Sequence, residues 1–559
     1  MQTLSSSRLQ SWLPWFARGL LLLGVFLLFA RLIELQVIKG SYYRNMSDEN
    51  RIRRVVIAAP RGMAYAKGGE LLIGNKEIKK RIIFQPDSGY TKTDDITNAP
   101  EDELVTQYIR YYPLGENLAH ISGYVGLVFE EEINKVDAEC KEKGIRQAER
   151  FVGRTGIEAE YDCILSGVDG EELIEVDTTG KKIRTLGRKE PIPGKDITTN
   201  IDYGLQKKLS EIFSEKTGSI VVSEPNGKIL AMYSSPSYDP NVFVGRISED
   251  KVQKVLQDES LPLFNRAIGG SYHPGSVYKP MIALMALEQG VVDENYTYVD
   301  EGYIEIKSPY GDFLYNNWYF TQYGGKEGEI GLQKALARST DTFFYKVGEM
   351  LGIDNIVKWS KSFGLDDKTG IDLPGEIPGL VPSPEWKMKV KGERWFLGNT
   401  YHVSIGQGDL ALTPIQIQRA ISVIASGGKL CTPTISKESE CSDMGIDGKN
   451  LKMVREGMKM ACTTGGTGYV FFDSNPQVAC KTGTAETNEE DVTHAWFTFF
   501  APAGEGENPD VIVTVMVEKG GEGSQVAGPL AKDVFNYLYG INEKKTDIKE
   551  DEVNLPINE

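Results

Sequence analysis

The chain has 559 residues, of which 40% are hydrophobic, and this length leaves room for two or three domains with a sizeable core. Its formal net charge is -17, and no run of Lys and Arg interrupts the acidic balance. We therefore exclude nucleic acid as a partner, because nucleic-acid binding needs a basic surface.

The N-terminal segment Leu13–Ile38 is mostly apolar, and the arginines that bracket its apolar centre can reach the two interfaces of a membrane. A cleaved signal peptide is the competing interpretation, but no A-x-A-like site follows the apolar centre. We expect an uncleaved transmembrane anchor over 15–38, preceded by a cytoplasmic N-terminus over 1–14. Basic residues on the two sides are too evenly divided to set the orientation.

The region 39–193 is mixed and polar, and we expect it to form a separate domain. Within it, Arg54–Ala58 alternates like a strand, and the charged stretch Glu130–Glu149 has helical character. Pro191–Gly194 predicts a linker to the next domain.

A β-hairpin opens the second half of the chain, because the apolar runs Ile220–Val222 and Ile229–Tyr233 are joined through Asn226-Gly227. Helical patterns follow, then strand patterns, and a last helix. The helices are expected over Lys279–Gln289, Leu332–Leu351, Pro414–Ala425 and Leu530–Tyr539, and the strands over Gln477–Cys480, Ala495–Phe500 and Val511–Val517. This order predicts an α+β fold with helices on the faces of one sheet, over 194–541. We expect the charged tail, 542–559, to be disordered.

The six cysteines form no C-x-x-C pair, which argues against a zinc site. Their number fits no known disulfide framework, so we expect buried or free thiols, with a disulfide between Cys431 and Cys441 as the alternative. The four histidines are isolated from one another, and we expect each of them to be structural.

Ser276-Val277-Tyr278-Lys279 is a candidate nucleophile motif of the S-x-x-K type. Pro274-Gly275 precedes it and places Ser276 at the start of an apolar helix, where positions i and i+3 share one face. Lys279 is therefore expected to face the Ser276 hydroxyl. A second S-x-x-K copy, Ser248 to Lys251, lies in an acidic stretch and is expected to be a surface turn.

Three K-T-G copies occur, and only one follows a strand pattern and precedes a second strand. This copy is Lys481-Thr482-Gly483-Thr484, whereas the copies that begin at Lys216 and Lys368 enter a hairpin and a loop. Between the serine motif and this strand lies Ser339-Thr340-Asp341. Three motifs in this order indicate a serine acyl-transfer site whose base is a lysine.

The same order of motifs is typical of penicillin-binding proteins and serine β-lactamases. The chain resembles the class B penicillin-binding proteins, the single-function peptidoglycan transpeptidases, along nearly its whole length. Further similar segments are Leu35-Gln36-Val37, Asn50–Arg53, Tyr112–Gly115, Gly153–Glu158, Asn265–Ala267, Ser404–Gly408 and His494–Phe497. Asp341, where most relatives have Asn, favours the elongation-type penicillin-binding protein 2. The segment Arg61–Gly69 departs from the family's pattern.

The resemblance implies an antiparallel sheet flanked by helices, carried on an N-terminal pedestal domain over 39–193. It implies that Ser276 is the nucleophile, Lys279 the base and Ser339 a proton relay, while Lys481, Thr482, Gly483 and Thr484 receive the substrate carboxylate. Asp341 beside Lys279 is expected to raise the pKa of that lysine, unless Lys481 offsets its charge. The alternative for Asp341 is an exposed helix residue.

The substrates implied are peptidoglycan stem peptides, with β-lactams as inhibitors, and the partners are the membrane, a RodA-like glycan polymerase and the cell-wall elongation machinery. The catalytic domain is expected outside a bacterial cell membrane, with no cofactor. Some elongation-type relatives have a metal site just before the second motif, but here the stretch from Asp300 to Arg338 contains neither His nor Cys, so we expect no metal. Two alternatives remain: a β-lactamase or β-lactam sensor with the same serine site, and a non-catalytic scaffold for wall synthesis.

Overall fold

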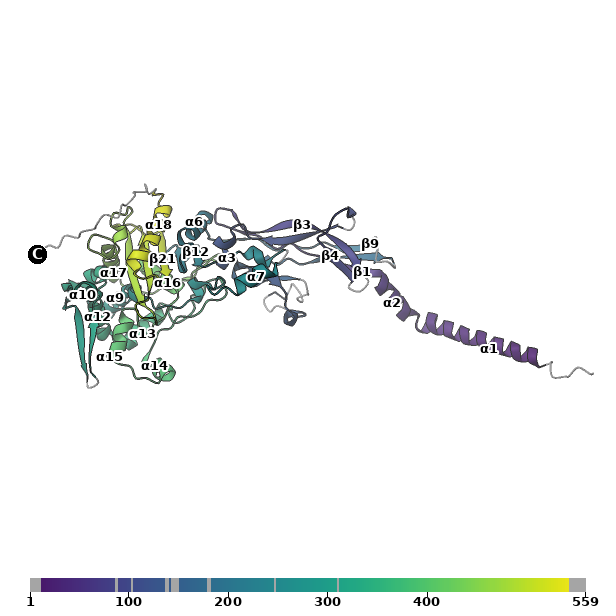
Figure 1. The fold of residues 1–559 in the computed structure, drawn as a ribbon, viewed down its shortest axis with the longest axis horizontal. Coiled ribbons are helices and arrows are strands. Elements are labelled where there is room, and N and C mark those ends of the chain that lie inside the picture. The colour runs from purple at the N-terminus through teal and green to yellow at the C-terminus, as the bar shows by residue number, and fades with distance from the viewer. Residues whose placement is uncertain are drawn as a thin grey trace, which may run out of the picture. The chain divides into compact units, whose positions relative to one another are not determined.

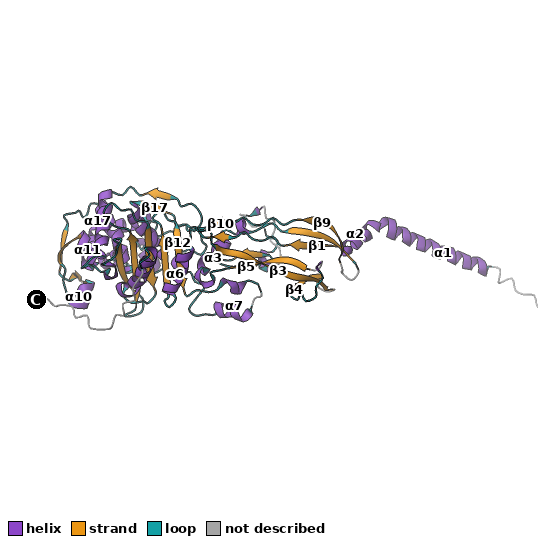
Figure 2. Ribbon diagram, turned by 90° about the horizontal axis from the view of Figure 1, so that it is seen from above, coloured by secondary structure: helices purple, strands orange, loops and turns teal. Residues whose placement is uncertain are grey.

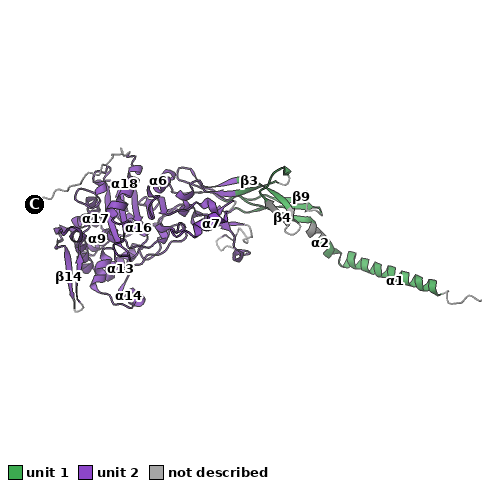
Figure 3. Cartoon of the chain, viewed as in Figure 1, with its two compact units in different colours: residues 1–60, 77–108, 167–194 green, residues 61–76, 109–166, 195–559 purple. Residues whose placement is uncertain are grey.

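The computed structural model describes residues 12–85, 89–101, 104–135, 140–141, 150–177, 182–245, 248–308 and 311–541. The tail over 542–559 and most of the expected cytoplasmic N-terminus lie outside the described residues. The chain divides into two compact units, which Figure 3 colours separately. Unit 1 comprises residues 1–60, 77–108 and 167–194, and unit 2 comprises 61–76, 109–166 and 195–559.

Unit 1 begins with an apolar helical segment over Leu13–Ile38, made of α1 (Leu13–Ile33) and the π-helical turn η2 (Glu34–Ile38) (Figure 1). It has a mean hydropathy of 2.2, and among the described residues it is the one helix long and apolar enough to cross a membrane. None of the α1 side chains is buried against the protein. The segment therefore fits a single-pass membrane anchor.

The rest of unit 1 is mainly β-structure. After α2 (Gly40–Arg51), an antiparallel sheet has the strand order β1-β8-β9. Its strands are β1 (Ile52–Ile57), β8 (Gly170–Val176) and β9 (Lys182–Lys189), and β1 lies at the strand predicted over Arg54–Ala58. The last residues of β3 (Leu71–Gln85) pair with β4 (Gly89–Thr93).

Unit 2 starts with short strands and helical turns. Their apolar side chains pack in one core with the predicted hairpin over 220–233. Leu114 and Ile157 are buried in the same cluster as Ile229 and Met232. The strands of this part are β2 (Ala64–Tyr65), the start of β3, the end of β5 (Leu104–Tyr111), β6 (Val125–Leu127), β7 (Phe151–Gly153) and β10 (Ile197–Thr198). The helical turns are η4 (Gly115–Asn117), α3 (Ala119–Ser122), η5 (Glu130–Glu132), α4 (Gly156–Glu160) and α5 (Asp162–Leu165).

The main sheet of unit 2 has five antiparallel strands in the order β12-β11-β21-β20-β19. Their bounds are β11 (Gly218–Ser223), β12 (Ile229–Ser235), β19 (Ala479–Glu486), β20 (Thr493–Ala501) and β21 (Val511–Val517). The predicted hairpin is confirmed as β11 and β12. Every residue of β11, β12 and β21 is buried, which explains why these strands are continuous apolar runs.

Helices cover both faces of this sheet, as Figure 2 shows. One face packs on α6 (Tyr203–Phe213) and α18 (Gly528–Leu538), and the other packs on helices that include α9 (Lys279–Glu288) and α16 (Pro414–Ser426). This three-layer arrangement confirms the predicted α+β fold. The edge strand β19 borders the cavity described below.

The remaining helical elements of unit 2 are η7 (Pro240–Phe243), α7 (Glu249–Leu256), α8 (Arg266–Gly269), η8 (Gly275–Tyr278), α10 (Trp318–Tyr323), α11 (Leu332–Arg338), α12 (Asp341–Leu351), α13 (Ile353–Ser362), α14 (Pro384–Lys391), α15 (Leu397–Ser404), α17 (Gly448–Ala461), η9 (Tyr469–Phe471) and η10 (Gly523–Ala527). Its remaining strands are β13 (Thr297–Asp300), β14 (Tyr303–Ser308), β15 (Gly311–Asn316), β16 (Gly328–Gly331), β17 (Lys429–Cys431) and β18 (Cys441–Asp443).

Two predicted helices differ from the structure. The helix expected over Leu332–Leu351 is broken after Arg338, because Ser339 has a left-handed backbone with φ of 57°. Of the charged stretch Glu130–Glu149, the structure describes a short helical turn, η5, while residues 136–139 and 142–149 lie outside the described residues.

The expectation of free thiols was wrong, because all six cysteines form disulfides: Cys140 with Cys163, Cys431 with Cys441, and Cys462 with Cys480. Each bond joins segments that the fold brings together. Cys431 and Cys441 are cross-strand partners in β17 and β18, and the third bond joins the end of α17 to the start of β19.

Candidate active site

Ser276 lies in η8, directly before α9, as its Pro-Gly context predicted. It is half-buried and lines a cavity. Gly275 before it has φ of 57° and donates its N–H to the Gly406 carbonyl at 2.9 Å. A Cβ on Gly275 would lie 2.9 Å from the Thr484 carbonyl oxygen, so glycine lets the serine loop approach β19 closely.

Lys279 is fully buried one helical turn after Ser276. Its Nζ donates to the Ser339 carbonyl at 2.8 Å, to Ser339 Oγ at 3.2 Å and to Asp341 Oδ1 at 2.6 Å. Ser276 Oγ makes no hydrogen bond within the described part of the chain. The lysine is thus beside the serine in the fold but bonded to the second motif.

Ser339 joins the two lysines of the site. Its Oγ accepts a hydrogen bond from Lys481 Nζ at 2.8 Å as well as the one from Lys279. Lys481 is fully buried in β19 and also donates to the carbonyl of Thr482 at 3.0 Å. The left-handed backbone at Ser339 turns the chain between α11 and α12 and brings its hydroxyl between these two amines.

Asp341 is the first residue of α12 and is 9% exposed, so the alternative of an exposed helix residue was wrong. Besides its ion pair with Lys279, its Oδ2 accepts the N–H of Trp318 at 2.9 Å. Its own N–H donates to Asn317 Oδ1 at 3.0 Å. Asn317 in turn donates to Asp300 Oδ2 at 3.2 Å, so a buried network holds the carboxylate in place.

Burial lowers the pKa of Lys279, although the Asp341 carboxylate acts in the opposite direction. The carboxylate thus acts on the pKa of Lys279 in the expected direction, but the cost of desolvating the ammonium outweighs its attraction. Burial, followed by the positive charge of Lys279, lowers the pKa of Lys481 well below its usual value. Two amines around one carboxylate favour a state in which one amine is neutral and able to accept a proton.

Strand β19 presents Thr482, Thr484 and Glu486 to the cavity, because alternate residues of a strand share a face. Thr482 Oγ1 donates to Thr467 Oγ1 at 2.8 Å, and Thr484 Oγ1 accepts the N–H of Gly523 at 3.2 Å. The two threonines therefore offer hydroxyls to the cavity.

Gly483 points the other way and does not line the cavity. A Cβ there would lie 3.0 Å from Val277 Cγ1 and from Trp496 Cβ, and 3.1 Å from the Pro274 carbonyl. The missing side chain lets the Ser276 loop pack against the strand. Gly483 therefore supports the position of the loop that carries Ser276, and it offers no side chain to the substrate.

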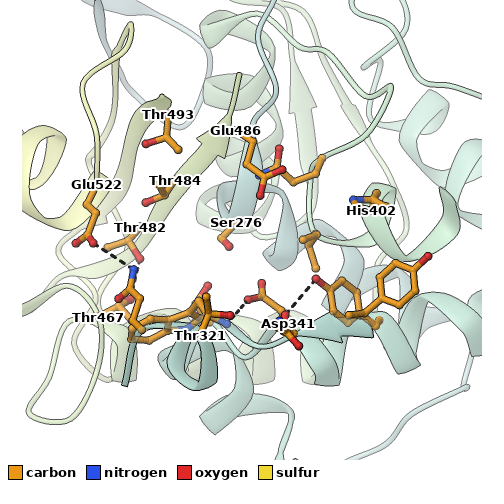
Figure 4. Close-up of a pocket in the computed structure, with 18 of the residues that line it drawn as sticks. Ser276, Thr321, Asp341, His402, Thr467, Thr482, Thr484, Glu486, Thr493 and Glu522 are labelled. Atoms are coloured by element: carbon orange, nitrogen blue, oxygen red, sulfur yellow. Dashed lines mark hydrogen bonds between the residues drawn. The ribbon is translucent and has the colours of Figure 1, made fainter. Parts of the chain in front are cut away.

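The cavity has a volume of about 550 Å³ and brings together residues that are far apart in the sequence (Figure 4). Its lining residues are Ser276, Leu314, Tyr315, Asn316, Trp318, Thr321, Gln322, Ser339, Asp341, Tyr345, His402, Ile405, Gln407, Thr467, Thr482, Thr484, Glu486, Thr493, Glu522 and Ser524. Sequence reasoning missed Asn317, Thr467, Glu486 and Glu522. Of these four, only Glu486 could have been found from the sequence, because it lies two residues after Thr484, the spacing at which residues of one strand share a face.

Among the described residues, no group of three or more His, Cys, Asp or Glu side chains is arranged to hold a metal ion. His402 is the one histidine that lines the cavity, and burial lowers the pKa of its imidazole. The arrangement of the site can activate a hydroxyl, move a proton between two amines and receive a carboxylate.

Comparison with known proteins agrees with this arrangement. Residues 218–536 match the penicillin binding protein transpeptidase domain, and residues 97–199 match the penicillin-binding protein dimerisation domain. The peptidoglycan D,D-transpeptidase MrdA of Acinetobacter baumannii is 32% identical, over 96% of this chain and 88% of the relative.

Two solved structures are similar over most of the chain. PBP2 of Helicobacter pylori, in a complex with MreC, has a TM-score of 0.74 and 30% identity, covering 88% of this chain and 99% of that one. A chain from a study of polymerization and crosslinking by a peptidoglycan synthase complex has a TM-score of 0.74 and 27% identity, covering 97% and 100%. The chain belongs to the penicillin-binding proteins, as a class B peptidoglycan D,D-transpeptidase of the MrdA or PBP2 type.

Proposed function

We propose that this chain cross-links peptidoglycan stem peptides during cell elongation, through an acyl-enzyme on Ser276. One observation carries the assignment of the site: a single hydroxyl, Ser339 Oγ, accepts hydrogen bonds from two buried lysines beside the cavity that Ser276 lines. Such a chain of groups can take a proton from the nucleophile and return it to a leaving amine.

In the first step, Ser276 Oγ attacks the carbonyl carbon between the two terminal D-alanines of the donor. Neutral Lys279 takes the hydroxyl proton, which is supported by the lowered pKa of this buried amine. The C–N bond then breaks, and the nitrogen of the departing D-alanine receives a proton through Ser339 Oγ. The product is an ester between Ser276 and the donor peptide.

In the second step, an amine of another stem peptide attacks the ester. The amine loses a proton to the Lys279–Ser339 pair, the C–O bond breaks, and Ser276 Oγ regains its proton. Asp341 holds Lys279 in place throughout, and we assign it a positioning role. The result is a new amide, which is the cross-link.

Two further groups of residues serve this reaction in our proposal. Lys481, Thr482 and Thr484 receive the terminal carboxylate of the donor, as a cation with neighbouring hydroxyls suits a carboxylate. The backbone N–H groups of Ser276 and Thr484 stabilise the oxyanion, and each such donor is typically worth about 3 kcal/mol in the transition state.

We further propose that the catalytic domain lies outside the cell membrane, anchored by the segment Leu13–Ile38. All six cysteines are paired, and disulfides form and persist in oxidising compartments outside the cytoplasm. The MreC complex and the synthase complex of the similar chains support a partnership with the cell-wall machinery, and we assign a RodA-like glycan polymerase as the partner. The pedestal over 39–193 and the transpeptidase domain over 194–541 remain the predicted boundaries.

Labelling with a fluorescent penicillin tests the site. The full-length protein in detergent should form a stable covalent adduct, and Ser276→Ala should form none although it folds as the wild type does. A transient adduct would instead identify a hydrolase that releases its acyl group. No adduct on folded wild-type protein would remove the case for catalysis and favour a scaffold.

A further inference from the structure

Glu486 is a carboxylate of the catalytic cavity for which the reaction described above has no use. It ends β19, it is exposed, and no hydrogen bond or ion pair of its side chain occurs among the described residues. Glu522, the other acidic residue of the cavity besides Asp341, differs, because it accepts hydrogen bonds from Gln322 at 3.2 Å and Gln525 at 2.7 Å. Glu486 alone is therefore free to meet a substrate.

The surroundings of Glu486 leave its negative charge without a fixed countercharge. The residues that line the cavity include no Lys or Arg. His402 lines the same cavity as Glu486, as Figure 4 shows, and burial lowers the pKa of its imidazole although the charge of Glu486 opposes this effect. The aromatic ring of Tyr315 packs edge-on against the imidazole of His402, with 5.7 Å between the ring centroids. A side chain with an apolar stem and a cationic end suits this corner.

The topology of the sheet indicates how a peptide reaches this corner. Strand β19 is at the edge of the five-stranded sheet, so its outer backbone groups can pair with an added peptide strand. A donor whose carboxylate lies at Lys481, Thr482 and Thr484 runs from there toward Glu486. Thr484 and Glu486 are two residues apart, or roughly 7 Å at the rise of a strand, and the same distance separates the terminal D-alanine from the residue two positions before it.

The chemistry of cross-linking supplies the cation. One stem peptide provides a D-alanyl group and another provides an amine, and both come from the same polymer, so each donor also carries an amine on a residue before its D-alanines. We propose that Glu486 binds the side-chain ammonium of the donor stem peptide, at the residue that precedes the two terminal D-alanines. This inference rests on the proposed function, and it assigns Glu486 as a specificity-determining residue for a diamino acid in the donor.

Two matched donors test the proposal: Nα-acetyl-Lys-D-Ala-thioglycolate, and the same compound with its side-chain amine acetylated. The rate at which each acylates Ser276 is measured on the full-length protein by mass spectrometry. The wild type should prefer the charged donor by about fivefold, as expected for a partly exposed ion pair. Glu486→Gln should bring the ratio of the two rates to about one, because it removes the attraction. Glu486→Lys should bring the ratio below one, because the new ammonium also repels the charged donor.

Glu490→Gln is the matched control, because Glu490 is an exposed carboxylate of the turn after β19 that does not line the cavity. An unchanged ratio in Glu486→Gln, or an equal fall in Glu490→Gln, would overturn the proposal. So would an effect of Glu486→Gln confined to the later transfer to an added amine, since this would place the bound ammonium on the acceptor. If a penicillin without a cationic side chain failed to label the folded wild-type protein, the proposed function itself would be refuted, and this outcome distinguishes the two failures.

Discussion

Replacement of Asp341 by Asn changes the charge beside Lys279 and keeps the shape of the side chain. Burial lowers the pKa of Lys279, and the Asp341 carboxylate raises it in opposition. Without the carboxylate, the pKa of Lys279 falls further, so the neutral amine that accepts the proton is present at lower pH. Asp341→Asn should therefore remain active, with the acidic limb of its pH–rate profile moved to lower pH.

The cost in stability follows from the hydrogen bonds that Asp341 accepts. Its two oxygens accept from Lys279 Nζ at 2.6 Å and from the Trp318 N–H at 2.9 Å. Asn has one acceptor oxygen, so one buried donor loses its partner whenever Lys279 is charged. We expect a loss of about 2 kcal/mol, which corresponds to a fall in Tm of roughly 4 °C.

The assay is the second-order rate of acylation by a fluorescent penicillin whose charge does not change between pH 5 and pH 10, measured over that range with thermal unfolding alongside. Asp341→Ala is the control, because it removes both acceptors and should lose more stability than Asp341→Asn. Loss of acylation at every pH in a folded Asp341→Asn protein would refute the positioning role. An acidic limb displaced to higher pH would show that the carboxylate does not raise the pKa of Lys279.

Two further predictions concern the packing around β19. Gly483→Ala should slow acylation by about tenfold or more and cost about 2 kcal/mol, because its Cβ overpacks against Val277; Gly448→Ala, where a Cβ meets nothing within 4 Å, is the control for thermal unfolding and acylation rate. Replacing Cys462 and Cys480 together by Ala should cost about 3 kcal/mol of stability and slow acylation, since this disulfide precedes Lys481 directly. Removal of the Cys431–Cys441 disulfide should cost a similar amount of stability with normal acylation kinetics, and equal kinetics in both double variants would contradict this.

Local patterns in the sequence were sufficient for several parts of the fold. The hairpin of β11 and β12 was predictable because Asn-Gly between apolar runs favours a tight turn. The apolar segment Leu13–Ile38 was predictable from composition alone, and Ser276 from the Pro-Gly context that starts its helix. Each of these signals depends on residues within a few positions of one another.

The sequence by itself determined the fold class, the apolar anchor segment and the order of the three motifs, because each is expressed in local spacing and hydrophobic period. Only the tertiary structure decided which cysteines pair, that burial outweighs Asp341 at Lys279, and that Glu486 is free in the cavity. These properties depend on contacts between distant residues: Ser339 is 60 positions from Lys279 and 142 from Lys481. Desolvation and hydrogen bonding of this kind arise only when the packed fold removes water from the groups involved.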